Sequence, residues 1–361
     1  MSALYEAQLA LRPTDRPLPE VTYSDFTVWH RDWMSGPELA RQLEFWRGKL
    51  QGAPNALDLH TDRPRPPMMS GDGSAEWFNV SAPTTAALRA VGLREGATLF
   101  MTLLGVWAAL LHQLARQTEV IVGTPVRGRG LPEVEKMMGF FVNALPLRLR
   151  VNPEASFLDL LRSVRAETVE AFGAQDVPFE HLVRVLDTKR DESRFPIYQA
   201  FFSYQNARQR PPRWGNLDHQ NLPVFQASAA QDLALWFLDG VDGLVGGLNY
   251  NTDIFEPATA VRWRRRYQAL LEAVAAHPDR PLSELLEVQG PYKFILFCDD
   301  LSFDADEPGY KALKVILDGS SFSTNKSTRL SNRSRSGIAM FSQRSIVSAA
   351  MNFGFFIWSS T

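Results

Sequence analysis

The sequence of 361 residues lacks the features that mark several large classes of protein. It has one cysteine, Cys298, which excludes an internal disulfide framework and fits a reducing compartment. Its first twenty residues contain acids and prolines and no apolar core, unlike a secretory signal. The apolar stretch at 346–358 is shorter than the ~20 residues of a membrane span. A net charge of −2 lacks the excess of positive charge that is typical of proteins that bind nucleic acids. We therefore expect a soluble cytoplasmic protein that binds neither membranes nor nucleic acids.

Motifs for the common catalytic and metal sites are also missing. None of the six histidines lies in an HExxH or HxH pattern or beside a CxxC pair, so no metal site is predicted. There is no GxSxG elbow, and Asn325, Lys326 and Ser327 lack the glycine that precedes the lysine of a Walker A loop. We predict no catalytic residue and no directly bound cofactor. His181, which follows the sequence PFE, is the one histidine that we consider as a site candidate; a hydrogen-bonded structural histidine is the commoner case.

The residues that are present predict a folded α/β protein. Hydrophobic residues make up 45% of the chain and charged residues 22%, which is enough for a sizeable core. Strand patterns at 75–80, 119–126, 195–205, 233–238 and 244–250 alternate with helix patterns at 84–93, 99–114, 156–172 and 257–277. Such interleaving is typical of the α/β class. We expect residues 74–285 to form one lobe whose central strands include 120–126 and 140–151.

Helices with a strong apolar face are predicted ahead of this lobe. Aromatic residues recur every three or four positions at Tyr23, Phe26, Trp29 and Trp33. A second helix is expected to begin at Pro37. Residues 57–73 contain three prolines and two glycines, which predicts a loop that crosses between lobes.

The segment 134–151, VEKMMGFFVNALPLRLRV, is the most informative stretch. Leucines alternate with Pro146, Arg148 and Arg150, which predicts a strand covered on one face. Asn143 is an amide inside an apolar run, so it must find hydrogen-bond partners or cost about 1–3 kcal/mol. Two interpretations stay open: Asn143 belongs to a functional site, or it ties a neighbouring loop to the strand.

Two further segments carry polar residues in defined positions. Asp176 precedes a Val-Pro step that restricts the backbone to extended geometry, so its carboxylate is predicted to cap the next turn. Asp191 and Arg194 have the spacing to pair across one turn.

Four motifs occur together in one order: YSDFTVWHRDW at 23–33, MGFFVNALPLRLRV at 138–151, AQDVPFEHLV at 174–183 and RDESRFPIYQAFFSYQN at 190–206. With TDRPRP at 61–66 and the stretch at 96–129, they resemble the later core motifs of condensation domains of non-ribosomal peptide synthetases. The resemblance covers about residues 1–285. It implies a set of motif residues that support a substrate tunnel: Tyr23, Asp25, Trp29, Gly139, Phe141, Asn143, Gln175, Asp176, Pro178, Phe179, Glu180, Arg190, Asp191, Ser193 and Arg194.

The resemblance also implies a fold and a reaction. The family is similar to chloramphenicol acetyltransferase, with two lobes in a V, and this chain is expected to form one lobe with a mixed sheet and flanking helices. In the family, one carrier protein delivers a donor thioester on a phosphopantetheine arm, a second carrier presents the acceptor amine, and an amide bond forms in the tunnel. We interpret residues 175–180 and 190–194 as supports of the tunnel wall rather than as catalysts.

The family's HHxxxDG motif, whose second histidine lies beside the attacking amine, is absent. Only 22 residues precede Tyr23, and none is a histidine. The chain therefore resembles the second lobe, without an acid–base group that contributes about 10²–10⁴-fold. Tyr23, Phe26, Trp29 and Phe141 are then expected to face water, or to be covered by the missing lobe or by self-association.

The chain changes character near residue 288. Residues 292–300, YKFILFCDD, predict a strand, and 291–320 resemble the Walker B strand and following helix of predicted bacterial AAA-type ATPases. After Asp318 there is no acidic residue, and a Ser-rich basic tail is expected to be disordered. We expect four segments: connecting helices at 1–73, the condensation-domain lobe at 74–287, an ATPase-like fragment at 288–319 and an unassigned tail at 320–361.

Three functions follow from these observations. The first is a truncated condensation domain, enzymatic by family and inactive alone. The second is a non-catalytic module that binds carrier proteins. The third is an ATPase fragment, against which the missing Walker A loop argues.

Overall fold

The computed structural model describes most of the chain: residues 2–13, 20–135, 137–186, 191–206, 213–214, 217–218, 227–240, 242–287, 294–298 and 337–341. These residues fall into two compact units, Met1–Val288 and Gln289–Thr361. In the second unit, β9 (Phe294–Cys298) pairs antiparallel with β10 (Gly337–Phe341). The strand predicted within 292–300 is thus confirmed, whereas β10 lies in the tail for which no regular structure was predicted.

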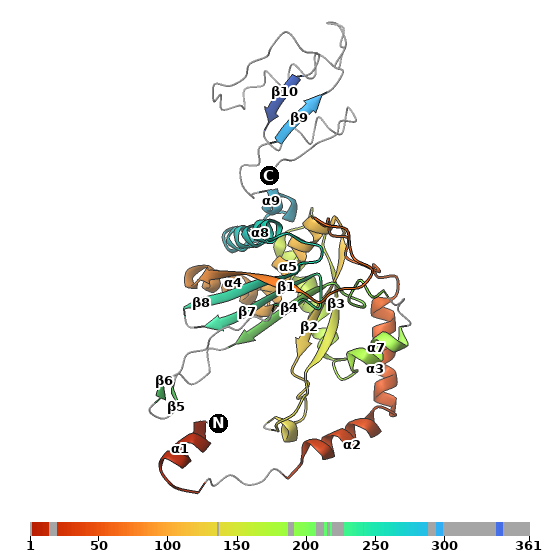
Figure 1. Cartoon of the computed structure of the whole chain (residues 1–361), viewed down its shortest axis with the longest axis vertical. Coiled ribbons are helices and arrows are strands. Elements are labelled where there is room, and N and C mark those ends of the chain that lie inside the picture. Colours follow the sequence, from red (N-terminus) through yellow and green to blue (C-terminus); the bar gives the residue numbers. More distant parts are fainter. Residues whose placement is uncertain are drawn as a thin grey trace. The chain divides into compact units, whose positions relative to one another are not determined.

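A six-stranded mixed sheet forms the centre of the first unit (Figure 1). Its strands are β1 (Gly73–Ser81), β2 (Glu119–Val126), β3 (Asn143–Arg150), β4 (Ala200–Asn206), β7 (Leu233–Gly240) and β8 (Gly243–Asn251). They lie in the order β1-β8-β7-β4-β2-β3, with β4 parallel to both β7 and β2 and the other pairs antiparallel. The short strands β5 (Arg213–Trp214) and β6 (Leu217–Asp218) pair separately. The predicted α/β class with a mixed sheet is confirmed.

Two strand predictions need correction. The segment at 140–151 is not a central strand, because β3 begins at Asn143 and lies at the edge of the sheet. Pro146, which has no N–H to donate, is compatible with an edge strand and not with a central one. The strand predicted from residue 195 begins only at Ala200. Residues 196–198 form a tight turn, in which the Tyr198 N–H donates to the Pro196 carbonyl at 2.8 Å.

Two helices described below add Leu39, Leu43, Trp46 and Leu182 to the main core around the sheet. Five further helices build most of that core. They are α4 (Ala82–Arg94), α5 (Leu99–Ala115), α6 (Phe157–Phe172), α8 (Pro257–Ala276) and α9 (Leu282–Glu287). Helix α5 is buried on most of its surface, as its apolar sequence predicts. Helix α6 begins with a capping box, in which Ser156 and Asp159 each accept the other's backbone N–H. In the described ranges no single helix is long and apolar enough to span a membrane; only α4 and α5, bent by 99°, pass that test as a pair.

The remaining helices are α1 (Ser2–Leu9), α2 (Tyr23–Trp33), α3 (Pro37–Leu50), the short 3₁₀ helix η1 (Pro132–Val134) and α7 (Phe179–Val185). Helices α2 and α3 begin where the sequence predicts them, whereas α1, η1 and α7 were not predicted. Helix α3 contacts α7, and α7 contacts β3. Helix α2 buries no residue and contributes Phe26 to a small apolar cluster with Val134, Met137 and Phe141, apart from the main core.

The loop at 57–73 is held by polar anchors rather than by regular structure. Asp62 accepts hydrogen bonds from the Glu256 N–H at 2.8 Å and the Thr259 hydroxyl at 2.9 Å, at the start of α8. Arg65 forms a bidentate pair with the fully buried Asp232, at 2.8 and 2.5 Å. These contacts explain the charged residues of TDRPRP as anchors of the crossing segment.

Candidate functional site

Asn143, the first residue of β3, is the centre of a hydrogen-bond node. Its Nδ2 donates to the Gln175 carbonyl at 2.8 Å and to the Val177 carbonyl at 2.7 Å. Its Oδ1 accepts the Phe179 N–H at 3.0 Å. One half-buried amide thus fixes the loop at 175–178 and the first residue of α7. The interpretation that Asn143 ties a neighbouring loop to the strand is confirmed.

Asp176 does not cap α7, and this prediction is wrong. Its carboxylate accepts from Nε2 of Gln42 at 2.9 Å, and its backbone N–H donates to Oε1 of the same side chain at 3.1 Å. The capping position is occupied by Asn143, since Pro178 offers no side-chain oxygen at the helix start. Asp176 therefore joins the loop to the buried Gln42 of α3, and Trp46 of α3 adds a bond to the Ala174 carbonyl at 2.8 Å.

Tyr23 and Phe141 join α2 to the loop before β3. The Tyr23 hydroxyl donates to the Phe140 carbonyl at 2.8 Å, and its ring meets Phe141 edge-on at 5.2 Å. A Cβ at Gly139 would lie 2.3 Å from the Tyr23 ring, so only glycine fits there. Phe141 is 8% exposed, which corrects the expectation that it faces water or a foreign partner. Tyr23 and Trp29, by contrast, keep 36% and 46% exposure.

Arg129 was missed by the sequence analysis. Its guanidinium lies 4.1 Å from the centre of the Phe141 ring and donates to the carbonyls of Val134 and, at 2.8 Å, Met137. It supports the loop and, together with α2, covers Phe141. The available signal was an arginine between Gly128 and Gly130.

Asp25 has a local role at the start of α2. It forms a capping box with Thr22, and the hydrogen bond from the Thr22 hydroxyl lowers the pKa of this exposed carboxyl. Its position supports a part in helix formation.

Residues 191–194 of the predicted motif form a turn supported by Arg65. Asp191 accepts from the backbone N–H of Ser193 at 2.9 Å and from its hydroxyl at 2.5 Å, and these bonds lower the pKa of Asp191. The predicted pair of Asp191 with Arg194 is present at 3.6 Å. Arg65 donates to the Ser193 carbonyl at 2.9 Å. Arg190 lies outside the described residues.

The comparisons with known proteins agree on one family. A family model described as "Condensation domain" matches residues 1–290, most of the chain. The chain belongs to the condensation-domain family. A model described as "Protein of unknown function (DUF815)" matches residues 281–334.

The relatives of this condensation domain are far longer. It is 38% identical over 287 residues to a linear gramicidin synthase of Brevibacillus parabrevis, covering 78% of the chain and 4% of that protein. It is also 38% identical over 270 residues to a phosphinothricin tripeptide synthetase of Streptomyces viridochromogenes, covering 74% of the chain and 25% of that protein. It spans only 4–6% of the first three curated relatives that it matches.

Two solved structures are similar to this condensation domain. The complex of the X-domain and OxyB from teicoplanin biosynthesis gives a TM-score of 0.69 at 27% identity, over 79% of this chain and 64% of that one. The four-domain nonribosomal peptide synthetase holo-AB3403, bound to AMP and glycine, gives 0.65 at 25% identity, over 70% of this chain and 20% of that one.

The predicted motif residues of the condensation domain gather in two adjoining places. Asn143, the loop at 175–178 and α7 form one, with the Tyr23–Phe141 contact next to it. The turn at 191–194 forms the other, and Phe195, the next residue, stacks on Phe179 at 5.7 Å. Glu180 is exposed and His181 half-buried on α7. The role of His181 stays a prediction.

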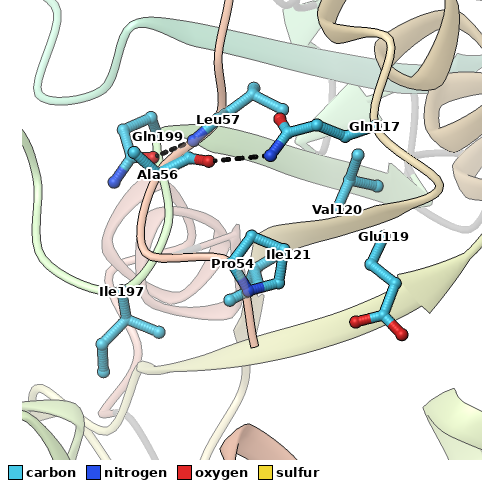
Figure 2. Close-up of a pocket in the computed structure, with 9 residues that line it drawn as sticks. All are labelled: Pro54, Ala56, Leu57, Gln117, Glu119, Val120, Ile121, Ile197 and Gln199. Atoms are coloured by element: carbon cyan, nitrogen blue, oxygen red, sulfur yellow. Dashed lines mark hydrogen bonds between the residues drawn. The ribbon is translucent and has the colours of Figure 1, made fainter. Parts of the chain in front are cut away.

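Two cavities of very different size are described in the condensation domain. Figure 2 shows one of about 10 Å³ between residues 54–57 and β2, closed by Gln199 and Gln117, which bond the backbone of Leu57 and Ala56 at 2.7 and 3.1 Å. It has room for about one water molecule. A groove of about 400 Å³ lies where β3 ends and α6 begins, with Glu119, Arg150 and Asp159 in its wall.

Proposed function

We propose that this chain supplies the carrier-facing lobe of a condensation domain, whose reaction is amide-bond formation between carrier-bound thioesters, and that it does not complete this reaction alone. The Asn143 node carries the proposal. All three of its bonds hold backbone in place, so the node supports a surface rather than transferring a proton. The sequence has no adjacent pair of histidines, and hence no HHxxxDG motif. The single cysteine supports a cytoplasmic location.

Helix α7 is the surface on which we expect a carrier protein to dock. It is seven residues long, too short to be stable alone, yet Asn143 fixes its first residue and Asp176 fixes the preceding loop to α3. Glu180 and Arg184 are exposed on it. A short helix that is already fixed in place suits a transient protein partner because little backbone entropy is lost on binding. The phosphopantetheine arm would enter beside this helix.

The exposed aromatic surface supports a second partner, a companion lobe. Tyr23 and Trp29 of α2, with Met138 and Phe140 of the adjoining loop at 91% and 78% exposure, leave a large apolar surface. The chain covers 64% of the X-domain complex chain that it matches, which leaves room for a further lobe in such a protein. We propose that this lobe covers the surface, and that the chain self-associates when the lobe is absent.

Two loaded carrier proteins test this function directly. The full chain is mixed with a donor and an acceptor carrier, alone and with a separately expressed lobe that contains HHxxxDG, and the dipeptidyl product is followed by mass spectrometry. Product only in the presence of the added lobe is the expected result. Binding is measured separately, by titrating a carrier protein into the chain and recording NMR spectra. Glu180→Lys changes the surface of α7, and Glu154→Lys, on an exposed turn elsewhere, is its control. Product from the chain alone would contradict the proposal. Carrier affinity that is the same in Glu180→Lys as in the parent chain would also contradict it.

A further inference from the structure

Tyr198 is held in place by a strained turn. Ile197 has φ of 67°, a region that a β-branched residue rarely occupies. The bond from the Tyr198 N–H to the Pro196 carbonyl spans two residues, as in a γ-turn. The turn presses the Tyr198 ring onto β2 at Gly123, where a Cβ would lie 2.2 Å from the ring. Strained residues of this kind persist at ligand clamps and active sites, because the surrounding structure must compensate for their cost.

The hydroxyl of Tyr198 has no hydrogen-bond partner in the described part of the chain. The residue is 2% exposed, and its ring lies 4.9 Å from Phe195 and 5.2 Å from Phe179. A buried tyrosine hydroxyl normally has a partner. Buried Tyr267 follows that rule, since its hydroxyl donates to the Leu103 carbonyl at 3.0 Å, and the hydroxyl of half-buried Tyr204 donates to Asp239 at 2.6 Å.

The surroundings define the group that the hydroxyl can bind. Burial, followed by the negative charge of Glu180, raises the pKa of Tyr198, so the phenol stays protonated and acts as a donor. The same carboxylate and the aromatic rings disfavour an anionic acceptor. A neutral carbonyl oxygen on a slender chain meets both conditions.

We propose that the Tyr198 hydroxyl donates a hydrogen bond to a carbonyl oxygen, amide or thioester, of the pantetheine arm of a carrier-bound substrate. This inference rests on the proposed function, because that function brings the arm to the lobe. Tyr198 binds and positions the arm in this scheme, and no bond is made or broken at its hydroxyl. The unpaired hydroxyl and the strained turn are then explained together as a site prepared for a ligand.

Binding of S-acetylpantetheine to the full chain tests the inference, with the dissociation constant measured by ligand-observed NMR. Tyr198→Phe keeps the ring and removes only the hydroxyl. Its melting temperature is expected to equal or exceed that of the parent, because no internal bond is lost, while its affinity for the probe falls about threefold to tenfold. Tyr204→Phe is the matched control: it removes an internally bonded hydroxyl, so melting is expected to fall while affinity stays within about twofold.

The outcomes separate the two proposals. Unchanged probe affinity in Tyr198→Phe overturns the inference and leaves the proposed function standing, provided that the parent binds the probe. A melting temperature that falls as far in Tyr198→Phe as in Tyr204→Phe also overturns it, because the hydroxyl would then have an internal partner. A parent chain that binds neither the probe nor a loaded carrier overturns the inference and the proposed function together.

Discussion

Asn143→Asp is the sharpest test of how the site is built. The substitution keeps the size of the side chain and the acceptor that meets the Phe179 N–H. It replaces the Nδ2 donor by an oxygen, which then faces the Gln175 and Val177 carbonyl oxygens at the present 2.8 and 2.7 Å. Two attractive contacts become repulsive ones, and the third remains.

The expected cost follows from those bonds. Each net hydrogen bond contributes about 0.5–1.5 kcal/mol, and an unsatisfied buried partner costs about 1–3 kcal/mol. With two bonds lost and partial access of water to the half-buried site, the free energy of unfolding should fall by about 2–4 kcal/mol. The two carbonyls raise the pKa of the new carboxyl, because its neutral form can still donate to one of them. A raised folded-state pKa gives stability that is complete below the unfolded pKa of about 3.9 and is lost as pH rises through the folded pKa, so the deficit should grow as pH rises above about 4.

Urea unfolding and hydrogen exchange measure this prediction on the full chain. Exchange should accelerate mainly in peptides that cover residues 174–186, where the lost bonds lie. Asn152→Asp is the control, since exposed Asn152 uses only its Oδ1, as acceptor of the Glu154 N–H at 3.1 Å, and an aspartate keeps that bond. It should change stability by less than about 0.5 kcal/mol. Equal effects of the two substitutions, or a deficit at Asn143 that shrinks as pH rises, would refute the reasoning.

Three further tests use pairs or pH windows within the same chain. Gly139→Ala would place a Cβ 2.3 Å from the Tyr23 ring, so proteases should release α2 faster, whereas Gly130→Ala enters open space and should leave digestion unchanged. Arg65→Lys removes one of the two hydrogen bonds to buried Asp232, so the free energy of unfolding in urea should fall by about 1.5–3 kcal/mol. Arg63→Lys, whose ion pair is half-exposed, should lower it by less than about 1 kcal/mol. Burial and then the bond to Asp239 raise the pKa of Tyr204 to about 12, so its stabilisation is complete below about pH 10 and is lost between about pH 10 and 12. In that window the stability of Tyr204→Phe should fall less steeply than that of the parent, and parallel curves would count against the assignment.

The long helices α2 to α6 and α8 were predictable from the sequence because their signals are local. The capping box of Ser156 and Asp159 and the apolar period of α5 lie within a few residues of the helix that they specify. The motif order likewise placed the chain in its family.

The sequence-based predictions were wrong where the structure depends on contacts between residues far apart in the sequence. Asp176 satisfied the local rule for a cap, but Asn143, 36 residues before Phe179, supplies the bond instead. The place of β3 at the sheet edge depends on strand order, which its leucine alternation does not encode. Phe141 is covered by Arg129 and by α2, and neither contact follows from the period of the segment in which Phe141 lies. The turn at Ile197 gave no sequence signal, because a β-branched residue argues against positive φ.

The remote cap of α7 has a consequence for the order of folding. A seven-residue helix does not nucleate by itself, and here the partner of its first N–H becomes available only when β3 has formed. Closing the intervening loop costs entropy before any bond repays it. Helix α7 is therefore expected to form after the sheet, with φ-values near zero along its length. Substitutions within α7 should accelerate unfolding and leave the folding rate unchanged.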